Sequence, residues 1–310
     1  MAPTAQQLEP DRARVRARRR EQSKNWSLFL LFAGPNIALI LAFIYYPLFS
    51  NMYYSTLDWR LGSSRATPVG LENYVTFFTS DSGREVWRVT GIFTAGAVIG
   101  SMLLGLLIAL VLNKHIPGKT AARTAVFSPY VLSGVGVAMV WNFIFDPARG
   151  GLAYLLDVVD LESPEWYLDS DWSLVMVIIV YVWKNLGYCA VVFLAGLQSI
   201  PRDLIEAATI DRAGPVRRFF SVTLPLLTPT VFFLLVTNIL FSMTNAFDIL
   251  RTMTPTGHGT NTIIFEIYLQ SFGAYQRAGY SAAIAVVLFF TLFLVTAVQM
   301  RFVERKVHYS

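Results

Sequence analysis

Long apolar runs alternate with shorter polar segments along the chain after its first 25 residues. Each run has roughly 20 residues or more, enough to cross the hydrocarbon core of a bilayer as a helix. The runs are Trp26–Phe49, 89–112, 124–145, 173–197, 224–249 and 280–303. Backbone groups in hydrocarbon must bond within their own segment, and such long continuous runs do not suit barrel strands. The pattern predicts an all-α, polytopic integral membrane protein with six transmembrane helices.

The composition agrees with a membrane protein. The chain of 310 residues has 55% hydrophobic and 15% charged residues and a mean hydropathy of +0.50. Soluble domains have about 25% charged residues, so a soluble protein is excluded. The single cysteine, Cys189, excludes an internal disulfide and makes a cysteine zinc site implausible. We expect Cys189 to act as a small apolar residue in a helix.

The basic residues predict the orientation. Seventeen Lys and Arg lie on the side of the two termini, seven lie on the other side, and Lys184 lies within the fourth run. Because cytoplasmic loops carry the Lys and Arg excess, both termini are expected in the cytoplasm. This accounts for the net charge of +5 without a nucleic acid partner. The predicted organisation is a basic tail over 1–25 and a transmembrane domain over 26–310. No small-residue cleavage site follows the first run, so a retained helix is expected.

The 146–172 segment is acidic and is expected outside the cell. It contains seven Asp and Glu and one Arg. A solvated loop is the preferred interpretation, and an ion site is the alternative.

The segment over 199–223, called the EAA segment below, is patterned like a short helix on the cytoplasmic side. Ser199 suits a helix cap and Pro201 a first turn, and Gly214 with Pro215 predicts the helix end. Asp203 and Glu206 place negative charge near the positive end of the helix dipole. The expected helix has about three turns. Four apolar residues share one of its faces: Ile200, Leu204, Ala207 and Ala208. A helix lying on lipid headgroups is the alternative, which the narrow apolar face and mixed charges disfavour.

The EAA segment resembles a known signature. The matching residues are Glu206, Ala207, Ala208, Asp211, Ala213, Phe219, Leu224 and Pro225. They resemble the cytoplasmic EAA loop of permease subunits of bacterial binding-protein-dependent ABC importers. Further matches to the carbohydrate-type branch are Tyr46, Pro47, Ser55, residues 70–74, residues 145–147 and residues 150–152. Within that branch, the EAA segment and the carboxyl end look most like the first permease of glycerol-3-phosphate or glycerophosphodiester importers.

The resemblance implies a type I ABC importer permease fold and a non-catalytic subunit in a bacterial inner membrane. It implies four partners: a second homologous permease, a cytoplasmic ATPase dimer, an external substrate-binding protein and membrane lipid. The chain has no GxxxxGK[ST] loop to hold phosphates, so ATP and Mg are expected on the partner ATPase and no cofactor on this chain.

The resemblance also implies that the EAA helix sits in a cleft of the ATPase. The coupling residues would be Glu206, Ala207, Ala208, Asp211, Arg212, Ala213 and Gly214. A pair between Glu206 and Arg202 within the helix is the alternative role for that carboxylate. Arg212 stands where the family usually has glycine, so a turn that needs positive φ must be made differently. We expect Gly214 to supply it.

Polar residues within the runs are the candidates for a solute pathway, because charges in a membrane are costly and usually functional. They are Lys184, Tyr188, Asn238, Asn245 and Asp248. The spacing of seven and three places Asn238, Asn245 and Asp248 on one helix face. Lys184 is expected to face an anionic solute or, equally, to pair with a carboxylate of a neighbouring subunit or snorkel. Asp248 lies near the outer end, where it could also reach water. Five glycines are expected to serve helix packing: Gly96, Gly100, Gly105, Gly134 and Gly136.

Other classes fit less well. A secondary transporter would need inverted repeats and ion-binding carboxylates in the membrane. A membrane enzyme would need a catalytic constellation, whereas His115, His258 and His308 fall in loops or the tail. A neutral disaccharide remains the main alternative solute.

Overall fold

A computed structural model describes residues 29–114, 117–212 and 214–306. The chain forms two units, Met1–Tyr54 and Ser55–Ser310. The whole predicted basic tail, residues 1–25, lies outside the described residues, as do residues 26–28 and 115–116, Ala213 and residues 307–310. The all-α prediction is confirmed, apart from one two-stranded hairpin, β1 (Leu57–Trp59) with β2 (Ala66–Pro68).

The first unit contains one apolar helix over Phe29–Tyr54. Its middle is a π-helical segment, η1 (Leu41–Tyr45), and it ends as α2 (Tyr46–Tyr54). Large apolar side chains along it, such as Phe32 and Phe43, are exposed. Exposed apolar side chains on a helix of this length suit contact with lipid or another membrane helix.

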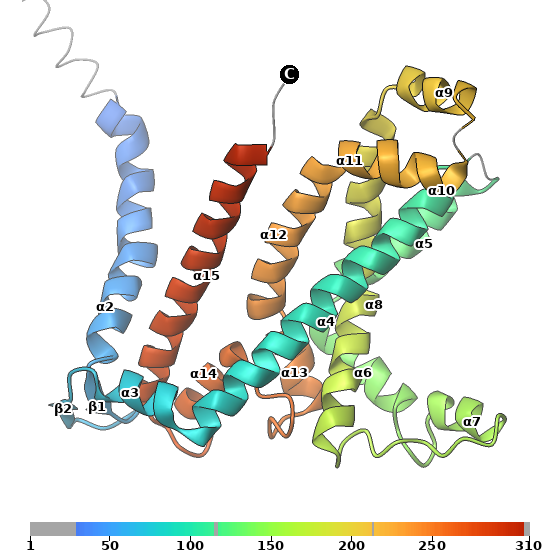
Figure 1. The fold of residues 1–310 in the computed structure, drawn as a ribbon. Coiled ribbons are helices and arrows are strands. Elements are labelled where there is room, and N and C mark those ends of the chain that lie inside the picture. Colours follow the sequence, from blue (N-terminus) through green and yellow to red (C-terminus); the bar gives the residue numbers. More distant parts are fainter. Residues whose placement is uncertain (1–28, 115–116, 213, 307–310) are drawn as a thin grey trace, which may run out of the picture. The chain divides into compact units, whose positions relative to one another are not determined.

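The second unit contains the remaining predicted spans. Three of its helices are long and unbroken: α4 (Asp81–Leu112), α8 (Ser170–Ser199) and α15 (Ala278–Lys306). Two further spans are bent pairs, so the described residues hold six candidate spans when each pair counts as one. α4 packs along α8 (Figure 1). α9 (Arg202–Ile210) follows the carboxyl end of α8, and α7 (Gly151–Asp157) lies near its amino end (Figure 1).

Caps and small residues explain the long helices. The Ser80 side chain accepts from the Gly83 N–H at the start of α4, and Asp169 accepts from the backbone at the start of α8. A Cβ on Gly105 would lie 2.5 Å from Cβ of Cys189, so α4 and α8 approach closely there. Gly96 and Gly100 make similar approaches to α8, which supports the packing role predicted for these three. Gly136 makes no such contact. Cys189 is buried, as expected.

The third predicted span, 124–145, is not one helix. It consists of α5 (Lys119–Val131) and α6 (Gly134–Ile144), which meet at an angle of 99°. Pro129 in the last turn of α5 lacks an N–H, and the Ser128 hydroxyl donates to the Ala125 carbonyl that this leaves free, at 3.1 Å. The prediction of a single helix over this span was wrong, because hydropathy does not show where a backbone turns.

The fifth predicted span, 224–249, is also interrupted. Its parts are α11 (Leu224–Leu226), α12 (Thr228–Thr244) and α13 (Phe247–Met253), preceded by α10 (Pro215–Arg218) and the π-helical η2 (Phe219–Thr223). The Pro215–Leu226 part meets α12 at 66°. Pro225 and Pro229 flank this bend and remove two backbone donors.

Predicted loops contain helices that periodicity did not indicate. They are α3 (Glu72–Thr79), α7 in the acidic segment and α14 (Ile263–Phe272). Asn142 of α6 donates to the Thr252 carbonyl at 3.3 Å, and the Tyr167 hydroxyl donates to the Asn142 carbonyl at 3.2 Å. Burial, with a smaller effect of Asp146, raises the pKa of Tyr167. Its phenol therefore remains a donor at neutral pH.

Candidate functional site

Two broken spans border one cavity, called the Lys184 cavity below. Its volume is about 320 Å³. The lining residues are Tyr130, Gly134, Tyr181, Lys184, Asn185, Phe241, Asn245, Asp248 and Ile249. They come from the unbroken helix α8, which carries Lys184, and from both sides of the α5–α6 break and of the α12–α13 break. Helix breaks leave carbonyl and N–H groups without partners in their own helix, so such places suit polar contacts.

Lys184 is bound to one of these free groups. Its Nζ donates to the Tyr130 carbonyl at 2.8 Å and lies 5.5 Å from the centre of the Tyr130 ring. Tyr130 is in the last turn of α5, where the negative end of the helix dipole favours a cation. Among the described residues the ion pairs are Arg84 with Asp81 and Arg88 with Glu85, so Lys184 forms none there.

Asp248, on α13, lies against α6, the other half of the α5–α6 span. A Cβ on Gly134, the first residue of α6, would lie 2.8 Å from Cβ of Asp248. The carboxylate is thus near the positive end of the α6 dipole. The cavity therefore has a cation at the carboxyl end of α5 and an anion at the amino end of α6.

The structure brings together three of the five predicted pathway residues, Lys184, Asn245 and Asp248. Tyr188 supports the wall, since its ring stacks on Tyr130 at 5.1 Å between centroids. Asn238 is 3% exposed and lies away from the cavity, where its Nδ2 donates to the Leu234 carbonyl at 2.8 Å. The shared face predicted for Asn238 and Asp248 does not form because the helix breaks between them.

Sequence reasoning missed Tyr130, Tyr181, Asn185 and Phe241. Tyr130 follows a proline inside an apolar run, and Ser133 with Gly134 follows it. This combination is a signal for a break that could have identified the α5 side of the cavity.

The EAA segment forms a short helix with different ends from those predicted. α9 covers Arg202–Ile210, about two and a half turns. Pro201 occupies the cap position, while Ser199 ends α8 and donates to the Gly196 carbonyl. Gly214 and Pro215 do not end α9; they begin α10. The prediction was wrong here because proline suits a helix start as well as the residue after a helix.

Arg212 makes the turn after α9. Its φ is +54°, while that of Gly214 is −61°. The expectation that Gly214 supplies the positive φ was wrong. Arg212 adopts the left-handed conformation directly, because Asp211 and Arg212 must close the helix by bonding back to Ala207 and Thr209.

The EAA segment borders a second cavity of about 670 Å³, called the EAA cavity below. Glu206, Lys119 and Arg218 are among its lining residues. Arg218 Nη1 donates to Thr209 Oγ1 at 2.8 Å and so ties α10 to α9. Ala207 and Asp211 are exposed, as are Leu204, Ile210 and Val216, whereas Ala208 is half-buried. The side chain of Arg202 is outside the described part, so its pairing with Glu206 stays a prediction.

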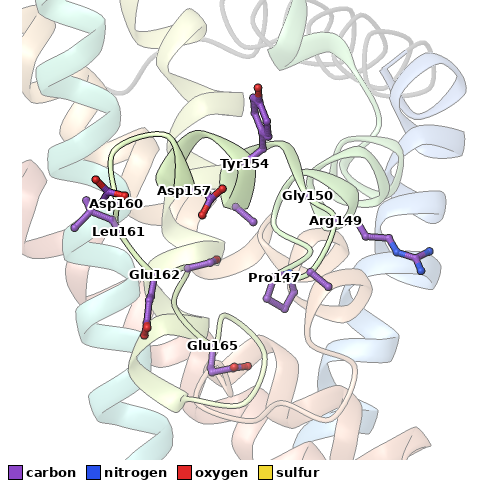
Figure 2. Close-up of a pocket in the computed structure, with 12 residues that line it drawn as sticks. Pro147, Arg149, Gly150, Tyr154, Asp157, Asp160, Leu161, Glu162 and Glu165 are labelled. Carbon is purple, nitrogen blue, oxygen red and sulfur yellow. The ribbon is translucent and has the colours of Figure 1, made fainter.

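A third cavity, of about 790 Å³, lies within the acidic segment. Four exposed carboxylates line it, from Asp157, Asp160, Glu162 and Glu165 (Figure 2). Figure 2 shows the Arg149 side chain extending away from them. Among the described residues, no three His, Cys, Asp or Glu side chains come together as metal ligands.

Comparison with known proteins identifies the family. Residues 101–309 match the family "Binding-protein-dependent transport system inner membrane component". The chain is similar to the sn-glycerol-3-phosphate transport system permease protein UgpA of Agrobacterium fabrum, with 35% identity over 284 residues, 90% of this chain and 96% of the relative. The protein with the same description in Escherichia coli strain UTI89 is 34% identical over 287 residues, 92% and 96% of the two chains.

Two solved structures share the fold. A bacterial alginate ABC transporter in complex with an alginate pentasaccharide-bound periplasmic protein has a TM-score of 0.79 and 21% identity, covering 92% of this chain and 96% of its own. A bacterial ABC transporter involved in alginate import has a TM-score of 0.74 and 24% identity, covering 91% and 98%. The expected permease fold is confirmed. The chain belongs to the family of inner-membrane components of binding-protein-dependent transport systems and is a permease subunit of an ABC importer.

Proposed function

We propose that this chain is one of two unlike permeases of an importer for glycerol 3-phosphate or glycerophosphodiesters. The second permease, an ATPase dimer and an external binding protein complete the complex. A single chain supplies one EAA helix, while a symmetric ATPase dimer presents two clefts, so a second permease must supply the other. The observation that carries the solute class is the Lys184 ammonium in the Lys184 cavity, together with the sn-glycerol 3-phosphate transport for which the relatives are named.

The cavity suits a small solute with an anionic end. Its volume is at the lower end of the range of ligand cavities, about 300–1,000 Å³. The Lys184 ammonium would attract a phosphate, and Asp248 and Asn245 would accept hydroxyl hydrogens of the glycerol part. A transport site must also release its cargo, so few contacts are an advantage. A neutral disaccharide is the second candidate, favoured by the aromatic wall of Tyr130, Tyr188 and Phe241.

The first prediction concerns Lys184. In the complex reconstituted with its partners, Lys184→Ala is expected to lower glycerol 3-phosphate uptake by about tenfold or more, because a charged hydrogen bond contributes about 1.5–3 kcal/mol. Lys184→Arg should retain part of the uptake. Lys114→Ala removes an exposed positive charge away from the cavity and is the matched control.

Two results would contradict this proposal. Normal uptake by Lys184→Ala, or loss of uptake only because the complex no longer assembles, would make Lys184 a structural residue. Uptake of a disaccharide in place of glycerol 3-phosphate by the wild-type complex would refute the solute.

A further inference from the structure

The helix α5 connects the Lys184 cavity with the EAA cavity. Tyr130, in its last turn, lines the first, and Lys119, its first residue, lines the second. The two residues are eleven positions apart, which is about 16 Å along a helix. A single rigid element therefore borders both the candidate solute site and the segment that resembles the ATPase contact.

The middle of α5 lies directly on α8. A Cβ on Gly187 would lie 2.1 Å from the Val126 carbonyl oxygen and 3.0 Å from Cα of Phe127. Backbone therefore contacts backbone there, with no side chain between the helices. Each end of α5 also borders a cavity, although the Tyr130 ring at the carboxyl end stacks on Tyr188 of α8. A helix held tightly at its middle with cavities at both ends can pivot about that contact.

The carboxyl end of α5 is held by the Lys184 ammonium, through the 2.8 Å bond to the Tyr130 carbonyl. The same ammonium lines the cavity, on a long side chain with rotatable bonds. An anion in the cavity would compete for it, because the ammonium attracts a full negative charge more strongly than it attracts a neutral carbonyl. When the ammonium moves to an anion, the Tyr130 carbonyl loses this donor.

We propose that Lys184 is a positioning residue that holds α5 in place while the Lys184 cavity is empty, and that an anionic solute releases this lock. α5 then pivots on Gly187 and moves Lys119 relative to Glu206 in the EAA cavity. The identity of the anion rests on the proposed function, but the lock itself does not. Release of the lock would transmit the binding of solute in the Lys184 cavity to the EAA segment, which resembles the ATPase contact.

Distance measurement between spin labels on the two sides of the EAA cavity tests this lock. Ala121 on α5 and Asp203 on α9 are exposed and suit labelling, while Cys189 is buried and would not compete for the label. The full complex is measured without solute and again with binding protein loaded with glycerol 3-phosphate. In the wild type, the solute is expected to shift the distance distribution.

The decisive variant is Lys184→Met, which removes the donor. Without solute, it is expected to show the distribution of the solute-bound wild type, a shift of about tenfold in the ratio of the two populations. Its solute-independent ATPase activity should rise, whereas Lys184→Arg, which keeps a cationic donor, should resemble the wild type. If Lys184→Met does not assemble, Lys184→Leu, which also has no donor, should give the same shift.

The outcomes separate the lock from the proposed solute. A solute-free Lys184→Met complex with the wild-type distribution and ATPase activity would overturn the lock, even if the wild type responds to glycerol 3-phosphate. A shift in Lys184→Met together with a wild type that ignores glycerol 3-phosphate would support the lock and refute the solute.

Discussion

Arg212 shows how a single residue can carry a turn for which glycine is better suited. Its φ of +54° lies in the left-handed region, where a side chain is disfavoured by about 1–2 kcal/mol. The turn directs the chain from α9 into α10, and the Arg212 side chain is exposed. Burial of this side chain therefore does not offset the conformational cost.

Arg212→Gly is expected to stabilise the complex by up to about 1 kcal/mol and to preserve transport, because glycine adopts positive φ without a steric penalty. Arg212→Val should destabilise it, because a β-branched side chain is poorly tolerated there. Thermal unfolding of the purified complex measures both changes. A lower melting temperature for Arg212→Gly than for the wild type would show that the arginine side chain makes a stabilising contact.

The element with the most evident interaction surface is α9. Its exposed residues include Leu204, Ala207 and Ile210, the last 81% exposed, so its apolar outer face is available to a partner. Exposed apolar residues grouped on one short helix are typical of a docking surface. Small residues such as Ala207 allow a partner to approach the helix closely.

Ala207→Trp and Glu206→Lys are expected to abolish coupling while the six spans remain inserted. The tryptophan would obstruct a close-fitting cleft on the ATPase. The lysine would repel the positive charge that Glu206 is expected to contact in that cleft. Because both positions are exposed, neither change should disturb the fold of this chain. Solute-stimulated ATPase activity of the reconstituted complex is the measurement.

The matched control is Ala148→Trp, at an exposed alanine outside the EAA segment. It should leave the stimulation near that of the wild type. Undiminished stimulation in both α9 variants would refute the docking role of this helix.

At the scale of the whole molecule, the distribution of charge predicts the orientation. Seventeen Lys and Arg lie on the side of the termini and seven on the other, so the positive-inside rule predicts that the termini are cytoplasmic. The acidic segment precedes α8 and the EAA segment follows it, so the predicted orientation places the EAA segment inside the cell and the acidic segment outside.

Cysteine labelling in sealed cells measures this orientation. Ala148→Cys in the acidic segment is expected to react with a membrane-impermeant reagent added outside. Asp203→Cys and Ser310→Cys should react only after the membrane is permeabilised. The native Cys189 is buried and gives a low background. External labelling at Ser310→Cys would reverse the predicted topology.

The sequence by itself determined the membrane class, the approximate spans, the orientation hypothesis and the EAA signature. These properties depend on local patterns, because about 20 consecutive apolar residues satisfy a bilayer whatever their neighbours are. The signature likewise lies within one short segment. The prolines near the breaks were also visible, but the angles of 99° and 66° were not.

Only the tertiary structure decided where the Lys184 cavity lies and which residues line it. The bend between α5 and α6 frees a carbonyl whose partner, Lys184, is 54 positions away, and it places Gly134 against Asp248. Asn238 and Asp248 diverge because α12 ends between them. A period of 3.6 residues assigns faces only within a continuous helix, so contacts across helix breaks depend on how distant elements pack.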